Sequence, residues 1–217
     1  MTSPGEARRS ARRDATRERV LDAARDVFAE RGVIGGTVEE ICERAGFTRG
    51  AFYSNFVDKA DVVEALIERE HARLLAHLDA NLALVQGTGP TSAGPDGSLD
   101  LTGVVDRILA SVPEDRALSL VQTELEVHAV REPATSAPFR AADARFRARL
   151  AGFVERGMWL QGRELLISPA DLVDAAVAIV ARSVRRALLA GDDTDPDALA
   201  RAVLPLLLLG ASRPRQV

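Results

Sequence analysis

The chain is poor in residues that would point to a disulfide-stabilised or membrane-spanning protein. It has a single cysteine, Cys42, among 217 residues, so no intrachain disulfide can form. A lone cysteine can be a nucleophile or a redox sensor, but it is more often a small buried apolar residue. The longest apolar run, AVLPLLLLGA, is far shorter than the roughly 20 residues of a membrane span. The N-terminus, MTSPGEARRSARRD, has no apolar segment behind its charges, so we expect no signal peptide, no membrane partner and a cytoplasmic protein.

Signatures of catalysis are missing as well. The histidines His71, His77 and His128 lack the spacing of metal ligands, since residues six apart do not share one helical face. The segment GVIGG has no strand before it and no Gly-Lys-Ser/Thr, so it is neither a dinucleotide-binding loop nor a P-loop. No serine or cysteine carries a nucleophile signature. We therefore expect no enzyme, no metal and no cofactor, with an all-α enzyme as the least favoured alternative.

Strand signals are absent, because β-branched residues occur singly inside helical patterns. Helix signals are frequent. An apolar stripe that follows residue 16 ends at Gly32, and Thr37 with Glu40 three residues later is typical of a capping box. That short helix stops at Gly46, and Thr48 is the next N-cap.

Further helices are expected at 58–85, 99–111, 114–131 and 138–161. Ser168-Pro169-Ala170-Asp171 marks the start of another helix, and Asp195-Pro196 repeats the pattern for the last one. The chain is therefore predicted to be all-α. We predict a flexible basic arm (1–13), an N-terminal three-helix bundle with a helix-turn-helix (14–60) and a larger helical domain (61–211) with a loop at 86–98.

The charge of the chain is unevenly distributed. The net charge is −4, but residues 1–59 carry eleven Lys and Arg against ten Asp and Glu. Six arginines and three acids fall within the first nineteen residues. A cationic end is usually only a solvated tail, but local charge is what phosphates feel, so a nucleic-acid partner is not excluded.

Scarce residue types gather in the stretch FTRGAFYSNFVDK, residues 47–59. It holds four of the nine aromatic residues and the only lysine, Lys59. On a helix capped by Thr48, Phe52 and Phe56 share one face, and Phe47 with Phe52 takes the positions of a hydrophobic staple. These aromatics are expected to fasten a short helix that would not persist alone in water.

The opposite face of this helix carries Gly50, Ala51 and Ser54, with Tyr53 and Asn55 at its sides. Arg49 stands in the first turn. Small residues let a helix approach closely, and polar side chains can read base edges in a major groove. The order of helix, short turn AGF and exposed second helix predicts a helix-turn-helix.

The segments TRERVLDAARDVFAERG and TVEEICERAGFTRGAFYSNFVDKADVVEAL resemble the TetR family of transcriptional repressors over about fifty residues. Farther along, only TELEVHAVREP and the helical layout are similar. The resemblance implies a DNA-binding regulator released from its operator by a small-molecule effector. A helical protein-interaction module that does not bind DNA is the alternative, and it predicts no salt-dependent retention on DNA.

The resemblance also implies roles for individual residues. Arg49 and Gly50 are expected to lie against base edges, with Tyr53 at the edge of the groove and Thr48 and Ala51 within the same surface. Backbone phosphates are expected at Thr37, Ser54, Asn55 and Lys59. One position departs from the family pattern: Glu39 stands where some relatives have a basic or polar residue. It can accept from cytosine, oppose contact with DNA, or support the capping of its own helix.

In relatives the larger domain dimerises and holds an effector. Here the helix from Pro169 carries one stripe of valines (173, 177, 180, 184) and a second stripe of Leu172, Ala176 and Ile179. The helix near 199–209 is apolar almost all round. Either a homodimer seam through 169–190 and 195–209 or deep burial in a monomer gives this pattern. A dimer would pair two recognition helices on a pseudo-palindromic operator.

An effector pocket is expected between the helices at 114–131 and 138–161. It would hold a small, largely apolar molecule, because the candidate lining offers few charges. Each of these side chains alone also fits an ordinary helical core. The candidates are Leu118, Gln122, Leu125, His128, Phe146, Phe153 and Trp159.

Overall fold

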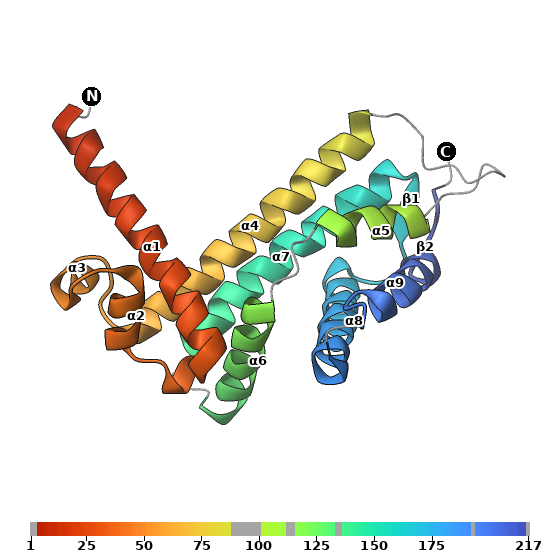
Figure 1. Cartoon of the computed structure of the whole chain (residues 1–217). Coiled ribbons are helices and arrows are strands. Elements are labelled where there is room, and N and C mark those ends of the chain that lie inside the picture. The colour runs from red at the N-terminus through yellow and green to blue at the C-terminus, as the bar shows by residue number, and fades with distance from the viewer. Residues whose placement is uncertain (1–3, 88–100, 112–115, 133–135, 192–193, 216–217) are drawn as a thin grey trace. The chain divides into compact units, whose positions relative to one another are not determined.

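A computed structural model of the chain describes residues 4–87, 101–111, 116–132, 136–191 and 194–215. These residues form nine helices and two short strands, so the all-α class is confirmed (Figure 1). Most of the predicted 86–98 loop lies outside the described residues. The helices are α1 (Pro4–Gly35), α2 (Val38–Ala45), α3 (Arg49–Tyr53), α4 (Lys59–Gly87), α5 (Leu101–Ser111), α6 (Arg116–Arg131), α7 (Ala137–Leu160), α8 (Pro169–Ala190) and α9 (Ala198–Gly210).

The helix α1 begins at Pro4, so residues 4–13 of the predicted basic arm are helical. The arm is rich in alanine and arginine, which are strong helix formers. Thr16 Oγ1 also donates to the carbonyl of Arg12, and Arg13 Nη2 donates to the carbonyl of Ser54. Charge alone therefore does not predict the helical backbone of this segment, because helix propensity and such long-range contacts also contribute.

Several predicted helix boundaries are confirmed. Gly32 has φ 78° and interrupts α1, with one more turn after it. Thr37 caps α2 in a capping box with Glu40, and Gly46 ends that helix in the left-handed region with φ 69°. Thr48 caps α3, accepting from the N–H of Ala51 at 3.2 Å. These caps act within four residues, which is why local sequence predicts them.

The chain divides into two compact units, Met1–Glu70 with Asp115–Ala142, and His71–Glu114 with Asp143–Val217. The first unit thus combines the helix-turn-helix with α6. Its core is apolar and includes Phe28, Phe52, Phe56, Ile41, Leu66, Val121 and Leu125. A compact N-terminal unit was predicted to end at about residue 60, whereas the first unit extends to Glu70 and also includes Asp115–Ala142.

In the second unit, α9 contacts both α8 and α5. Buried Val105, Leu109, Ala200 and Leu204 form its apolar cluster, against which Ile179 packs. One stripe of α8 therefore faces α9 within the same chain. The N-cap of α8 is confirmed, since Ser168 accepts from the N–H of Asp171 at 3.0 Å.

Two details of this unit differ from prediction. The helix α9 starts at Ala198, because Asp195 accepts from the N–H of Asp197 and holds a turn before the helix. Strands β1 (Arg163–Leu165) and β2 (Ser212–Pro214) pair antiparallel, although no strand was expected. Three residues are too few to show an alternating pattern. Among the described residues, no helix has both the length and the apolar content needed to cross a membrane.

Candidate nucleic-acid interface

The short helix α3 is fixed to the first unit from one side. Phe52 and Phe56 are at most 2% exposed, with ring centroids 5.7 Å apart. The half-buried ring of Phe47 packs against the same core. Phe52 also contacts the ring of Tyr53 edge-on, with centroids 5.2 Å apart. The predicted aromatic support of α3 is therefore present in the structure.

The outward side of α3 is open. Arg49, Gly50, Tyr53 and Ser54 are exposed, and Ala51 is half-buried. A Cβ built on Gly50 would meet only Thr48 Oγ1, at 3.8 Å. Packing within the described chain therefore does not require glycine at position 50, and a smooth surface here suits a partner that approaches from outside.

The C-terminal end of α3 is closed by its own side chains. Ser54 Oγ donates to the carbonyl of Ala51 at 2.7 Å, and Asn55 Nδ2 donates to the same carbonyl at 2.8 Å. Asn55 is half-buried, and its buried Oδ1 has no hydrogen-bond partner among the described atoms. Both residues thus shape the end of α3 in addition to their expected place near phosphates.

Arginines of α1 hold the two helices of the motif, which the sequence did not reveal. Arg17 Nη1 donates to the carbonyl of Asn55 at 3.3 Å, and its guanidinium lies 4.5 Å from the centroid of Phe56. Arg19 Nη2 donates to the carbonyl of Ala45 at 2.8 Å and stacks over Phe47. These carbonyls follow the ends of short helices, where acceptors lack intrahelical partners. Arginine supplies both the planar stack and the donors.

Arg49 is paired on the surface. Its Nη1 lies 2.8 Å from Glu39 Oε1, and both side chains are more than half exposed. A hydrogen bond with Tyr53, followed by the charge of Glu39, raises the pKa of Arg49. Glu40, not Glu39, closes the capping box of α2. Three roles were considered for Glu39, and its geometry does not favour helix capping.

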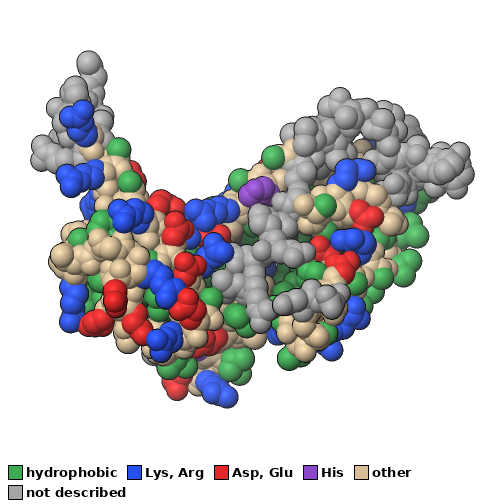
Figure 2. Space-filling model, in the orientation of Figure 1, with side chains coloured by type: hydrophobic (Ala, Val, Ile, Leu, Met, Phe, Trp, Pro, Cys, Tyr) green, Lys and Arg blue, Asp and Glu red, His purple; other side chains and the backbone are tan. Residues whose placement is uncertain are grey.

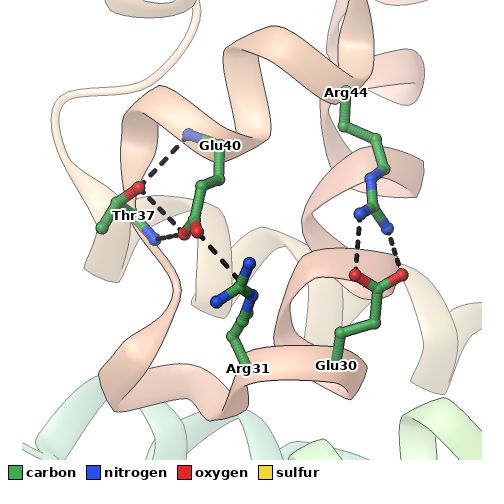
Figure 3. A network of polar contacts seen from close by, with 5 residues as sticks. All are labelled: Glu30, Arg31, Thr37, Glu40 and Arg44. Atoms are coloured by element: carbon green, nitrogen blue, oxygen red, sulfur yellow. Dashed lines mark hydrogen bonds and ion pairs between the residues drawn. The ribbon is translucent and has the colours of Figure 1, made fainter.

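A polar network ties α2 to α1 (Figure 3). Arg44 donates to both carboxylate oxygens of Glu30, at 2.6 and 2.7 Å, which is a bidentate ion pair. Hydrogen bonding to Arg44 lowers the pKa of Glu30, and hydrogen bonds from Thr37 lower the pKa of Glu40. Thr37 is thus exposed and preorganised at the start of α2.

Lys59 occupies a different place from the one expected of a free phosphate contact. Its Nζ donates to the carbonyls of Val33, Ile34 and Gly36 at 2.9, 3.1 and 2.9 Å. An ammonium has three N–H groups, so this arrangement uses all of them. A phosphate contact by Lys59 requires that at least one of these bonds be exchanged or shared.

Charges of both signs are interspersed over the part of the first unit that faces the viewer in Figure 2. Acidic side chains therefore lie among the basic ones that were expected near the N-terminus. The described residues contain no group of three or more His, Cys, Asp or Glu arranged to hold a metal. Cys42 is buried, and burial raises the pKa of its thiol, as suits a core residue.

The predicted effector residues fall in both units. Leu118, Gln122, Leu125 and His128 belong to the first unit, whereas Phe146, Phe153 and Trp159 belong to the second. Only two of them, Leu125 and His128, line a cavity of about 520 Å³ in the first unit.

The aromatic candidates lie in other surroundings. Phe146 is buried and stacks on His71 with centroids 4.1 Å apart, and Phe153 is also buried. Trp159 is 59% exposed under the guanidinium of Arg215, 3.4 Å from its centroid.

Residues 20–66 match the family model described as bacterial regulatory proteins, tetR family. That range contains α2, α3, the second half of α1 and the first residues of α4. Over this range the chain is similar to TetR-family regulators.

Curated relatives match short stretches of the chain. BepR of Brucella suis, named as a transcriptional repressor, is 52% identical over 54 residues. SrpR of Pseudomonas putida, named as a transcriptional regulator, is 41% identical over 63 residues. The matches cover 25% and 29% of this chain, and 26% and 30% of the respective relatives. Both relatives are named as regulators of transcription.

Two solved structures of transcriptional regulators share the fold over nearly the whole chain. SmeT, the repressor of the Stenotrophomonas maltophilia efflux pump SmeDEF, has a TM-score of 0.59 at 22% identity. FadR of Bacillus subtilis, in complex with stearoyl-CoA, has a TM-score of 0.66 at 19% identity. The matched regions cover 91% and 89% of this chain and 90% and 98% of those proteins. At these identities the likeness establishes the fold alone.

Proposed function

We propose that the protein is a sequence-specific regulator that binds duplex DNA through α3. The observation that carries the proposal is the two-sided construction of this helix. One side is fixed by buried Phe52 and by Arg17, while the other presents Arg49 and Gly50 outward. A rigid helix with a low-profile, donor-rich face is what a major groove accommodates.

The proposed division of contacts follows the positions on this surface. Arg49 and Gly50 lie against base edges, and Tyr53 lies at the edge of the groove. Thr37 lies near a backbone phosphate at the start of α2, and Thr48, at the start of α3, belongs to the same surface. Ala51, Ser54, Asn55 and Lys59 complete the surface.

We propose a homodimer on a pseudo-palindromic operator. One side of α8 packs against α9 in the same chain, while Leu189, Leu206 and Leu209 are 85%, 68% and 53% exposed. Leucines exposed on two neighbouring helices support a partner surface. A two-fold symmetric dimer would present two copies of α3 to two half-sites.

Repression relieved by a small, largely apolar effector is the proposed mode of control, with the protein acting in the cytoplasm. Two relatives are named repressors, and one structural neighbour holds an acyl-CoA. An effector acts by favouring a conformation in which the paired recognition helices no longer match the half-sites.

The test is selection from a random duplex library with the full-length protein, together with light scattering of the free protein. An enriched inverted repeat and a dimer mass are expected. Recovery of no sequence preference, with no salt-dependent retention on DNA, would instead favour a helical protein-interaction module.

A further inference from the structure

The cavity of about 520 Å³ in the first unit is large enough for a small-molecule ligand. It is enclosed by the end of α1, the first turns of α4, α6 and the start of α7. Much of its wall is apolar, including Ile34, Val63, Ile67, Leu125 and Phe139. The aromatic residues predicted for the effector, Phe146, Phe153 and Trp159, are not part of it.

The charged groups at this cavity are mostly carboxylates: Asp58, Asp61, Glu64 and Glu124. Asp58 and Asp61 each accept one backbone N–H, from Asp61 and Val57 respectively, at 2.9 Å. A carboxylate has about four acceptor sites, so both can accept more. Glu64 is half-buried and has no hydrogen bond or ion pair with any residue that the structure describes.

The positive charge at the cavity is weaker. Lys59 is the one lysine of the chain, and its three N–H groups are already donated to carbonyls. His128 also lines the wall. An anionic ligand would face four carboxylates, whereas a cation would complete their coordination in a partly enclosed, apolar surrounding.

We propose that this cavity binds a small molecule with an apolar body and one cationic group that pairs with Glu64. Such a ligand buries its body against Ile67, Leu125 and Phe139. Its charge is compensated by the carboxylates of the wall. This names a binding site and a ligand class that differ from the aromatic pocket expected from the sequence.

One carboxylate of the cavity also holds the last turn of α1. Glu124 accepts from the N–H of Val33 at 2.7 Å and of Ile34 at 3.0 Å. A Cβ on Gly32, which has φ 78°, would lie 2.9 Å from Glu124 Oε2. The carboxylate therefore sits directly against this segment, which leads into the cap of α2. A bound cation would compete with these two N–H groups for Glu124. This regulatory use rests on the proposed function, whereas the binding site does not.

Three probes with the same body test the ligand class: 4-phenylbutylamine, 4-phenylbutanol and 4-phenylbutanoate, titrated calorimetrically into the full chain at pH 7. The amine is expected to bind, and the acid is expected not to. Glu64→Gln should weaken the amine about tenfold, as expected for one charged hydrogen bond. The matched control is Glu126→Gln, an exposed position of α6 outside the cavity, which should leave amine binding unchanged. Equal binding of the acid, no binding of the amine, or equal loss in both variants overturns the proposal.

Amide hydrogen exchange tests the coupling without DNA. Amine binding should speed exchange at Val33 and Ile34 and leave exchange within α8 unchanged. Unchanged exchange at Val33 and Ile34 in the saturated protein would overturn the competition for Glu124. If the amine binds as described but the protein retains no DNA in library selection, the cavity stands and the proposed function fails.

Discussion

Arg49 on α3 and Glu39 on α2 form an ion pair, with Nη1 and Oε1 2.8 Å apart. Both side chains remain more than half exposed, so the pair contributes little to stability. It places a carboxylate beside the arginine that is expected to read a base. We therefore expect Glu39 to influence both the affinity and the sequence specificity of the proposed DNA binding.

Replacing Glu39 with glutamine should tighten binding to all duplexes severalfold at low salt, because it removes a negative charge near phosphates. The effect should shrink as salt screens the charges. Fluorescence anisotropy against specific and scrambled duplexes measures it. Glu43→Gln, on the same helix and also exposed, is the matched control. Parallel changes in both variants would mean that the effect comes from net charge alone.

Arg49→Ala should relax the base preference of the operator at one position in each half-site. Discrimination there should fall roughly 5- to 150-fold, the range for one bidentate contact with guanine. A second library selection with the variant measures this. An unchanged preferred sequence would show that α3 does not read bases through Arg49.

Arg17 is expected to position α3, because it donates to the carbonyl of Asn55 and stacks on Phe56. Both Arg17→Ala and Arg17→Lys should lower the unfolding free energy and weaken DNA binding. Lysine keeps the charge but loses the planar guanidinium. Urea unfolding and a salt titration of DNA affinity separate the roles. Full rescue by lysine would identify a phosphate contact instead.

Lys59→Ala should destabilise the protein by at least about 1.5 kcal/mol, because three carbonyls lose a charged donor. If Lys59 also contacts a phosphate, the slope of log affinity against log salt should fall by about one. Urea unfolding measures the first effect and anisotropy the second. An alanine variant of unchanged stability would contradict the contact with the carbonyls of Val33, Ile34 and Gly36.

Glu40 should contribute to the pH dependence of stability. Hydrogen bonds from Thr37 lower its pKa below the ordinary 4.5, so the unfolded state binds the proton more readily. Its contribution is complete above the ordinary value and is lost as the pH falls through the lowered one. Glu40→Gln should therefore flatten the pH profile of the unfolding free energy in this acid range. Glu30 and Arg44 are retained in both the parent protein and the variant. Identical pH profiles of the unfolding free energy in the two proteins would contradict the role of the capping box.

Helix caps and other features that depend on residues close together in the chain could be predicted from the sequence. Thr37, Gly46, Thr48 and Ser168 were predicted as caps and are caps, because capping joins groups only a few residues apart. The aromatic face of α3 was predictable for the same reason, since Phe52 and Phe56 are one helical turn apart.

Hydrogen bonds between long polar side chains and residues far away in the chain could not be predicted from the sequence, because they depend on the tertiary structure. Arg13 and Ser54 are 41 residues apart, and Val33 and Glu124 are 91 apart. Lys59 reaches carbonyls 23 to 26 residues before it. Such side chains can reach many acceptors, and sequence spacing does not say which one the fold brings within about 3 Å. The same holds for Trp159: its place under Arg215 depends on packing of the C-terminal segment and not on its own helix.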